Sequence, residues 1–123
     1  KIIEMEIKKT GKLFSFCCAA PAIIKKRNIK EIKYFEKIGG NIGLLFQIAD
    51  DLIDFKGSSK IAGKKTGKDQ KKGKATLISL LGYANAIKYC NKIILNVNKD
   101  LKKYGSNSTN ISETLNYILN RDE

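Results

Sequence analysis

The stretch "GLLFQIADDLIDF", residues 43–55, places three aspartates, Asp50, Asp51 and Asp54, in an otherwise apolar segment. They make up half of all the aspartates of a chain that carries 24 basic residues against 12 acidic ones. No lysine or arginine occurs within residues 38–55. Clustered carboxylates repel one another unless something positive joins them. The stretch therefore predicts a positively charged partner that comes from elsewhere.

A helix through this stretch would put the carboxylates on a single face. At about 100° per residue, the three aspartates share that face with Gln47 and with Gly39, Gly40 and Gly43. A solvated face of this protein should instead carry lysine and avoid glycine, which costs roughly 1 kcal/mol per residue in a helix. The pattern favours a helix that lines a cavity. Mg²⁺ fits such a face because it typically takes one or two carboxylates together with phosphate oxygens of a substrate.

The spacing of apolar residues is helical nearly everywhere, so the sequence predicts an all-α fold. A length of 123 residues with 42% hydrophobic content suffices for one domain with a core. Asn28 is a candidate N-cap with Glu31 three residues later, Thr10-Gly11 should break or kink the first helix, and Gly105 offers a stop. The predicted helices span about residues 1–24, 28–56, 75–104 and 111–120, with a basic Gly/Lys loop at 57–74.

Composition excludes several classes of function. The chain has no histidine, so histidine-based acid–base catalysis is excluded within it. Cys17, Cys18 and Cys90 are odd in number and form no C-x-x-C pair, which predicts buried, reduced thiols of a cytoplasmic protein and no disulfide framework or zinc site. No apolar run is long enough to span a bilayer. The net charge of +12 fits a solubilising lysine coat, or a nucleic acid, lipid or phosphorylated partner.

The loop at residues 57–74 contains four glycines and seven lysines and directly follows the aspartates. It is not a Walker P-loop, because Gly63 and Gly67 are one residue too close and Lys68 is followed by Asp69. Lysines and exposed backbone N–H groups still suit phosphate.

Three ordered motifs together resemble a known family. "GLLFQIADDLID" resembles the second aspartate-rich motif of the trans-isoprenyl diphosphate synthases, "GKKTGKDQKKGKAT" resembles their basic loop, and "KTGKL" from Lys9 resembles their K-T-[GA]-x-L motif. The bacterial farnesyl diphosphate synthase type is the most similar. The resemblance implies the C-terminal helices of the all-α isoprenoid synthase fold. It also implies condensation of isopentenyl diphosphate with an allylic diphosphate, dimethylallyl or geranyl.

The resemblance also assigns a metal site. Asp50 and Asp51 would coordinate Mg²⁺, with Mn²⁺ as the alternative, on the allylic diphosphate. Asp54 would support this site, and Asp69 would act through water. The absence of histidine fits this chemistry, since no histidine base is required.

The remaining roles concern the substrates. Taken alone, Phe46 is a core residue, the loop lysines are solvated, and Arg121 belongs to a solvated tail, with contact to a phosphate in the closed state as the less favoured alternative. The resemblance adds that Lys9 and Lys64 hold the leaving diphosphate, Thr10 and Gln47 line the site near the allylic cation, Phe46 lies near the isopentenyl unit, and Lys74 helps to close the phosphate region.

The family uses two aspartate-rich helices, and this chain carries only the second. We therefore expect the C-terminal half of a longer cytoplasmic, homodimeric enzyme, inactive as residues 1–123 alone and with a product length that this half does not determine. Two other hypotheses stay open: a basic helical nucleic-acid-binding module and a catalytically inactive subunit of the same fold. A membrane-surface bundle would need a helix with a strong basic–apolar split, and stable membrane insertion is not expected.

Overall fold

The computed structural model describes residue 4, residues 7–62 and residues 77–121. All the secondary-structure elements among these residues are helices, and none is a strand. The predicted all-α fold is confirmed. The elements in chain order are η1 (Ile7–Gly11, π-helical), α2 (Lys12–Ile24), α3 (Ile29–Ala62), α4 (Leu77–Leu81), α5 (Tyr83–Leu101), η2 (Lys102–Ser108, 3₁₀-helical) and α6 (Thr109–Asn120).

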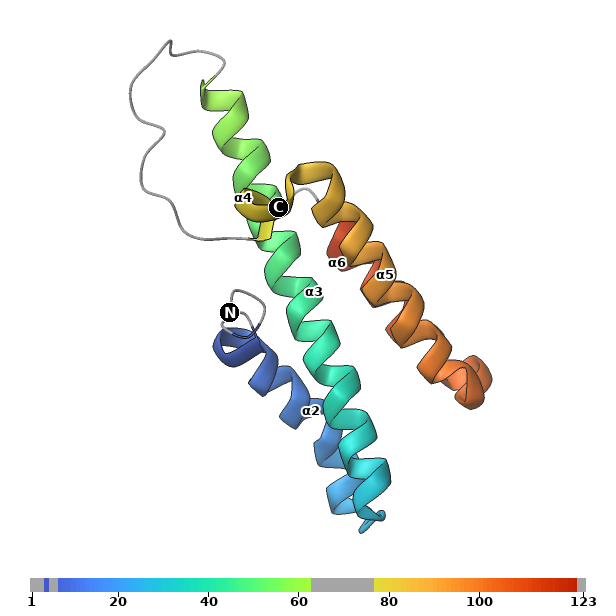
Figure 1. Ribbon diagram of the computed structural model, residues 1–123. Helices are drawn as coiled ribbons and strands as arrows, with labels where there is room; N and C mark the ends of the chain where they lie inside the picture. The colour runs from blue at the N-terminus through green and yellow to red at the C-terminus, as the bar shows by residue number, and fades with distance from the viewer. Residues whose placement is uncertain (1–3, 5–6, 63–76, 122–123) are drawn as a thin grey trace.

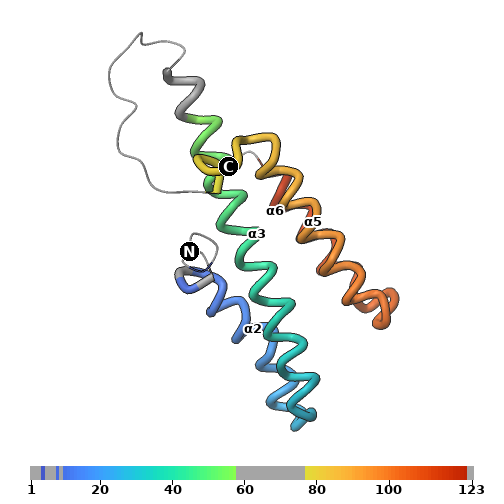
Figure 2. Tube along the Cα trace, viewed as in Figure 1, coloured from blue at the N-terminus to red at the C-terminus, as the bar shows by residue number. Residues whose placement is uncertain are grey.

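Helix α3 is the axis of the fold, and α2, α4, α5 and α6 all pack against it (Figure 1). The Cα trace shows α2 along the first half of α3 and α5 on its other side (Figure 2). Burial of apolar side chains from three helices stabilises this arrangement. The largest of the fully buried side chains are Ile38, Leu45 and Ile48 of α3, Val97 and Cys90 of α5, and Leu115 of α6.

Helix α3 begins where the sequence predicts, directly after Asn28. The Glu31 backbone N–H donates to Asn28 Oδ1 over 3.0 Å, which confirms Asn28 as the N-cap. The other end differs, because α3 runs to Ala62, beyond the predicted end at residue 56. Extending an existing helix adds one hydrogen bond for each residue fixed, and this offsets the cost of Gly57.

The helix predicted at 75–104 is divided in two at Gly82, which has φ +78° between α4 and α5. Only glycine adopts this left-handed region without strain. Gly105, the residue predicted as a stop, interrupts η2 with φ +56°. At Thr10-Gly11 the helix changes type instead of breaking, since the π-helical η1 leads directly into α2.

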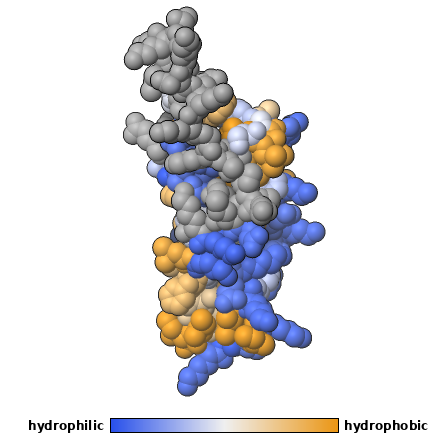
Figure 3. Space-filling model, turned by 60° about the vertical axis from the view of Figure 1, so that its left-hand side comes forward, coloured by the Kyte–Doolittle hydropathy of each residue, from blue (hydrophilic) through white to orange (hydrophobic). Residues whose placement is uncertain are grey.

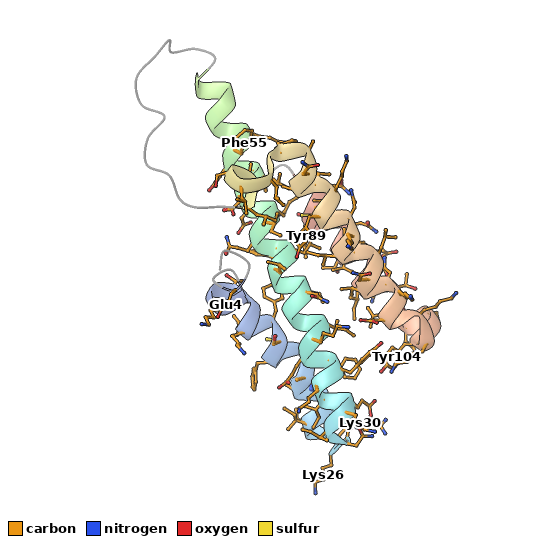
Figure 4. All side chains as sticks on the ribbon, in the orientation of Figure 1. Glu4, Lys26, Lys30, Phe55, Tyr89 and Tyr104 are labelled. Atoms are coloured by element: carbon orange, nitrogen blue, oxygen red, sulfur yellow. The ribbon has the colours of Figure 1, made fainter. Side chains whose placement is uncertain are left out.

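Aromatic side chains near both ends of α3 pack against residues from Tyr83 to Tyr104. Near the C-terminal end of α3, the rings of Phe55 and Tyr83 stack with centroids 5.7 Å apart. At the opposite end, the ring of Phe35 packs on Tyr104 with a centroid distance of 5.8 Å, and the hydroxyl of Tyr34 donates to the carbonyl of Asp100. Figure 4 labels Phe55 and Tyr104 at these two ends. The contacts hold α5 antiparallel to α3 along its length.

The cysteines correct one prediction. Cys90 is fully buried, and burial raises the pKa of its thiol to about 12. All three cysteines are free thiols, but Cys17 is exposed on α2, so the expectation of three buried thiols is wrong. At about 100° per residue, Cys17 lies about 200° around α2 from the buried Ala19, so it points away from the side of α2 that is covered.

The glycine face of α3 does not line a cavity as predicted. A Cβ on Gly39 would lie 2.3 Å from the carbonyl oxygen of Phe14, and one on Gly43 would lie 2.6 Å from the Cα of Gly11. The backbone of η1 and α2 therefore lies directly on the backbone of α3. The missing side chains make room for a helix and not for a substrate.

Apolar side chains remain exposed where α2 meets the start of α3. Figure 3 shows them gathered toward the lower end of one face. Phe16 is 64% exposed and Ile24 is 77% exposed, and Leu13, Ile23 and Ile29 are also exposed. Within the described residues, none of the helices combines the length and the apolar character that a bilayer crossing requires.

We predict that Gly39→Ala lowers the free energy of unfolding by about 1–3 kcal/mol, because the added methyl group meets the backbone of α2. Gly57→Ala is the matched control, since nothing lies within 4 Å of a Cβ there, and it should stabilise by up to about 1 kcal/mol through helix propensity. Urea denaturation of both variants makes the comparison. Equal effects of the two substitutions would contradict the close approach.

Candidate functional site

The three aspartates lie on α3 next to the buried Gln47, and their exposure differs. Asp54 is exposed, Asp51 is half-buried, and the side chain of Asp50 is 40% exposed. The predicted helical face of carboxylates is thus present, at the place where α3 leaves the cover of α2 (Figure 1).

Gln47 joins this face to the segment "KTGKL". The hydroxyl of Thr10 donates to Gln47 Oε1 over 3.0 Å, although the two residues are 37 positions apart. Gln47 is only 7% exposed, so this contact satisfies a buried acceptor. The structure therefore brings together two residues that the sequence motifs had placed at one site.

Arg121 completes the other side of the face, and this corrects the expectation of a solvated tail. Its guanidinium forms an ion pair with the carboxylate of Asp50. The guanidinium carbon also lies 4.5 Å from the centroid of the Phe46 ring. Such a position favours a cation, because the face of an aromatic ring is negative.

Phe46 is half-buried between two helices rather than enclosed in the core. Its ring lies 5.6 Å from that of Phe14 on α2. Phe46 thus contacts both α2 and the residue that follows α6.

A cavity of about 200 Å³ lies between α3, α5 and the end of α6, beside the ion pair. Its walls are mixed, with Leu52, Ile53 and Ile87 on the apolar side and Asn91, Asn120 and Arg121 on the polar side. This volume is below the range of about 300–1,000 Å³ that is usual for pockets holding drug-sized ligands.

Comparison with known proteins identifies the family. Residues 1–118 match the family model described as Polyprenyl synthetase. The chain belongs to this family.

Two relatives illustrate the similarity. Farnesyl diphosphate synthase of Micrococcus luteus is 33% identical over 120 residues, which are 98% of this chain and 41% of the relative. Geranylgeranyl diphosphate synthase of Cyanophora paradoxa is 29% identical over 118 residues, 96% of this chain and 39% of the relative. The chain thus spans about two-fifths of the length of these relatives. No solved structure matches it.

The polyprenyl synthetase motifs lie partly within the described residues. The structure places Thr10, Phe46 and Gln47 beside the aspartates of α3. Lys9 belongs to η1 by its backbone. The other predicted site residues, Lys64, Asp69 and Lys74, lie outside the described residues.

A hard cation on these carboxylates would need further ligands. Within residues 7–62 and 77–121, no group of three or more histidine, cysteine, aspartate or glutamate side chains is arranged to hold a metal ion. Mg²⁺ needs only one or two carboxylates when phosphate oxygens supply other ligands. In this structure the carboxylate of Asp50 is paired with the guanidinium of Arg121.

The sequence did not predict that Arg121 pairs with Asp50. It is one of only two arginines among 24 basic residues, and this rarity is the one signal the sequence offered. Arginine suits a paired site better than lysine, because its planar fork matches a carboxylate.

We predict that Thr10→Val lowers the free energy of unfolding by about 1–3 kcal/mol, because Gln47 Oε1 then loses a buried donor. Thr10→Ser keeps the hydroxyl and should stay close to the wild type. Thermal unfolding of the two variants measures the difference. A valine variant as stable as the serine variant would show that the hydrogen bond contributes little.

Proposed function

We propose that the chain carries the second aspartate-rich part of the active site of a short-chain trans-prenyltransferase. The enzyme would condense isopentenyl diphosphate with dimethylallyl or geranyl diphosphate. The carboxylate face of α3, with Thr10 bonded to Gln47 at its edge, is the observation on which the proposal rests. Relatives named as farnesyl and geranylgeranyl diphosphate synthases support it.

Asp50 and Asp51 would hold Mg²⁺, or Mn²⁺ in its place, with Asp54 supporting them and Asp69 acting through water. The chemistry that the metal would supply is neutralisation of the negative charge on the departing diphosphate. Charge interactions strengthen where water is excluded, so covering these carboxylates in the longer protein would strengthen this effect.

The other residues would hold and orient the substrates. Lys9 and Lys64 would bind the allylic diphosphate, and Lys74 would help to close the phosphate region. Thr10 and Gln47 would present oxygen dipoles to the developing allylic cation, and their mutual hydrogen bond fixes the direction of both side chains. Phe46 would lie near the isopentenyl unit.

The proposal includes a second part of the same enzyme that contributes the first aspartate-rich helix. The curated relatives are more than twice as long as the matched region, and apolar side chains such as Phe16 and Ile24 are exposed on α2. Buried against another helical part, these side chains would add apolar area to the core. We further propose a cytoplasmic homodimer, as the family resemblance implies.

The alternatives receive less support. A nucleic-acid-binding module would use arginines and aromatic rings as readers, but Arg121 is engaged by Asp50 and by Phe46. An inactive subunit of the same fold would not need the carboxylate of Asp50, and the following experiment separates this alternative from the proposed enzyme.

In the longer protein proposed here, Asp50→Ala should lower the rate of Mg²⁺-dependent product formation by about 10²–10³-fold, as loss of a group that stabilises the transition state does. Glu113→Gln, on the exposed side of α6, is the control and should retain activity. Radiolabelled isopentenyl diphosphate incorporated into organic-extractable product gives the rate. Unchanged activity of the alanine variant would contradict the assigned metal site.

Residues 1–123 alone should yield no condensation product, because they hold one of two aspartate-rich helices. The same assay with Mg²⁺, isopentenyl diphosphate and dimethylallyl diphosphate tests this. Circular dichroism of the chain must first show helical content, so that lack of product is not due to unfolding. Any product that depends on Mg²⁺ and on Asp50 would show that one helix suffices.

A further inference from the structure

The ion pair of Arg121 with Asp50 joins the end of the last helix to the residue that the proposed function assigns to a metal. Arg121 follows α6, and its backbone N–H donates to the Tyr117 carbonyl over 2.9 Å. This bond anchors the residue, while its extended backbone directs the chain away from the helix axis. The guanidinium thus reaches Asp50 across 71 positions of sequence.

The guanidinium is more deeply placed than the carboxylate it binds. The side chain of Arg121 is 18% exposed, whereas that of Asp50 is 40% exposed. Within the described residues, Arg121 Nε is buried and has no hydrogen-bond partner. A buried donor without a partner costs free energy, so the bond to Asp50 satisfies this guanidinium only in part.

One carboxylate oxygen of Asp50 cannot serve a guanidinium and a divalent cation in the same place. We propose that Arg121 is an internal cation that occupies Asp50 in the metal-free protein, and that a divalent cation must displace it. This inference rests on the proposed function, because it takes Asp50 as a metal ligand. Arg121 is then a positioning residue. Metal binding breaks its ion pair with Asp50 at the end of α6, and release of the metal lets the ion pair form again.

The expected effect is moderate. For an ion pair as exposed as this one, the equilibrium constant between the paired and the unpaired state is up to about five. A cation that binds Asp50 only in the unpaired state loses apparent affinity by a similar factor. Removal of the guanidinium should therefore tighten metal binding by about two- to fivefold.

Electron paramagnetic resonance of free Mn²⁺ measures this affinity in the 123-residue chain. Arg121→Gln should bind Mn²⁺ about two- to fivefold more tightly than the wild type. Lys88→Gln removes an equal charge from the exposed side of α5 and should change the affinity less than Arg121→Gln does. Asp50→Asn should weaken binding, and adding Arg121→Gln to it should bring no gain. A gain that persists in the double variant would reveal a general charge effect and overturn the proposal.

Side-chain NMR gives a second measurement that does not depend on affinity. The chain has only two arginines, so two Nε–Hε signals are expected. Mg²⁺ should shift the signal of Arg121, while that of Arg27, whose nearest carboxylate is Glu31 at 3.8 Å, serves as the internal reference. Saturating Mg²⁺ without a shift of the Arg121 signal would overturn the displacement.

The outcomes separate the two proposals. If Mn²⁺ binding does not depend on Asp50, the proposed metal site fails and the competition fails with it. If binding depends on Asp50 but is the same in Arg121→Gln, the metal site stands and only the competition is overturned.

Discussion

Close contact between two helix backbones governs this fold. Gly39 and Gly43 lie one turn apart on α3, and the backbone atoms of Phe14 and Gly11 lie where their side chains would be. Two helices can approach this closely only where one of them lacks side chains at the crossing. Because α2 is held at that distance, the η1 segment before it comes to rest beside Gln47, and Thr10 can form its hydrogen bond.

The carboxylate face is thus bordered by segments from both ends of the chain. Thr10 approaches it from the N-terminal side, and Arg121 approaches it from the end of α6. Phe46 lies between them, with its ring against Phe14 on one side and beneath the guanidinium on the other. Helix α3 carries all the central residues, so its packing against α5 and α6 places the site as well as the core.

Several features followed from local sequence because local chemistry decides them. Asn28 caps α3 through its own side chain, and Gly105 interrupts the helical backbone as predicted. The three motifs also sufficed to indicate the family, which the match over residues 1–118 confirms. The break at Gly82 was not predicted, because a glycine within an apolar helical pattern interrupts the helix only if its φ is positive, and the pattern does not reveal φ.

The glycine face shows how one pattern can have two physical meanings. A helix face without side chains leaves room, and a helical projection does not tell whether a ligand or another backbone fills it. Here the backbone of α2 fills it.

The sequence alone places three carboxylates on one face of a helix with no cation between them. Which cation pairs with Asp50 depends on how the helices pack. That cation is Arg121, 71 residues away, and it arrives because α6 packs on α3 and ends beside the carboxylate. Electrostatic partners are chosen by distance in space, and the packing of the core, rather than the spacing of residues, sets that distance.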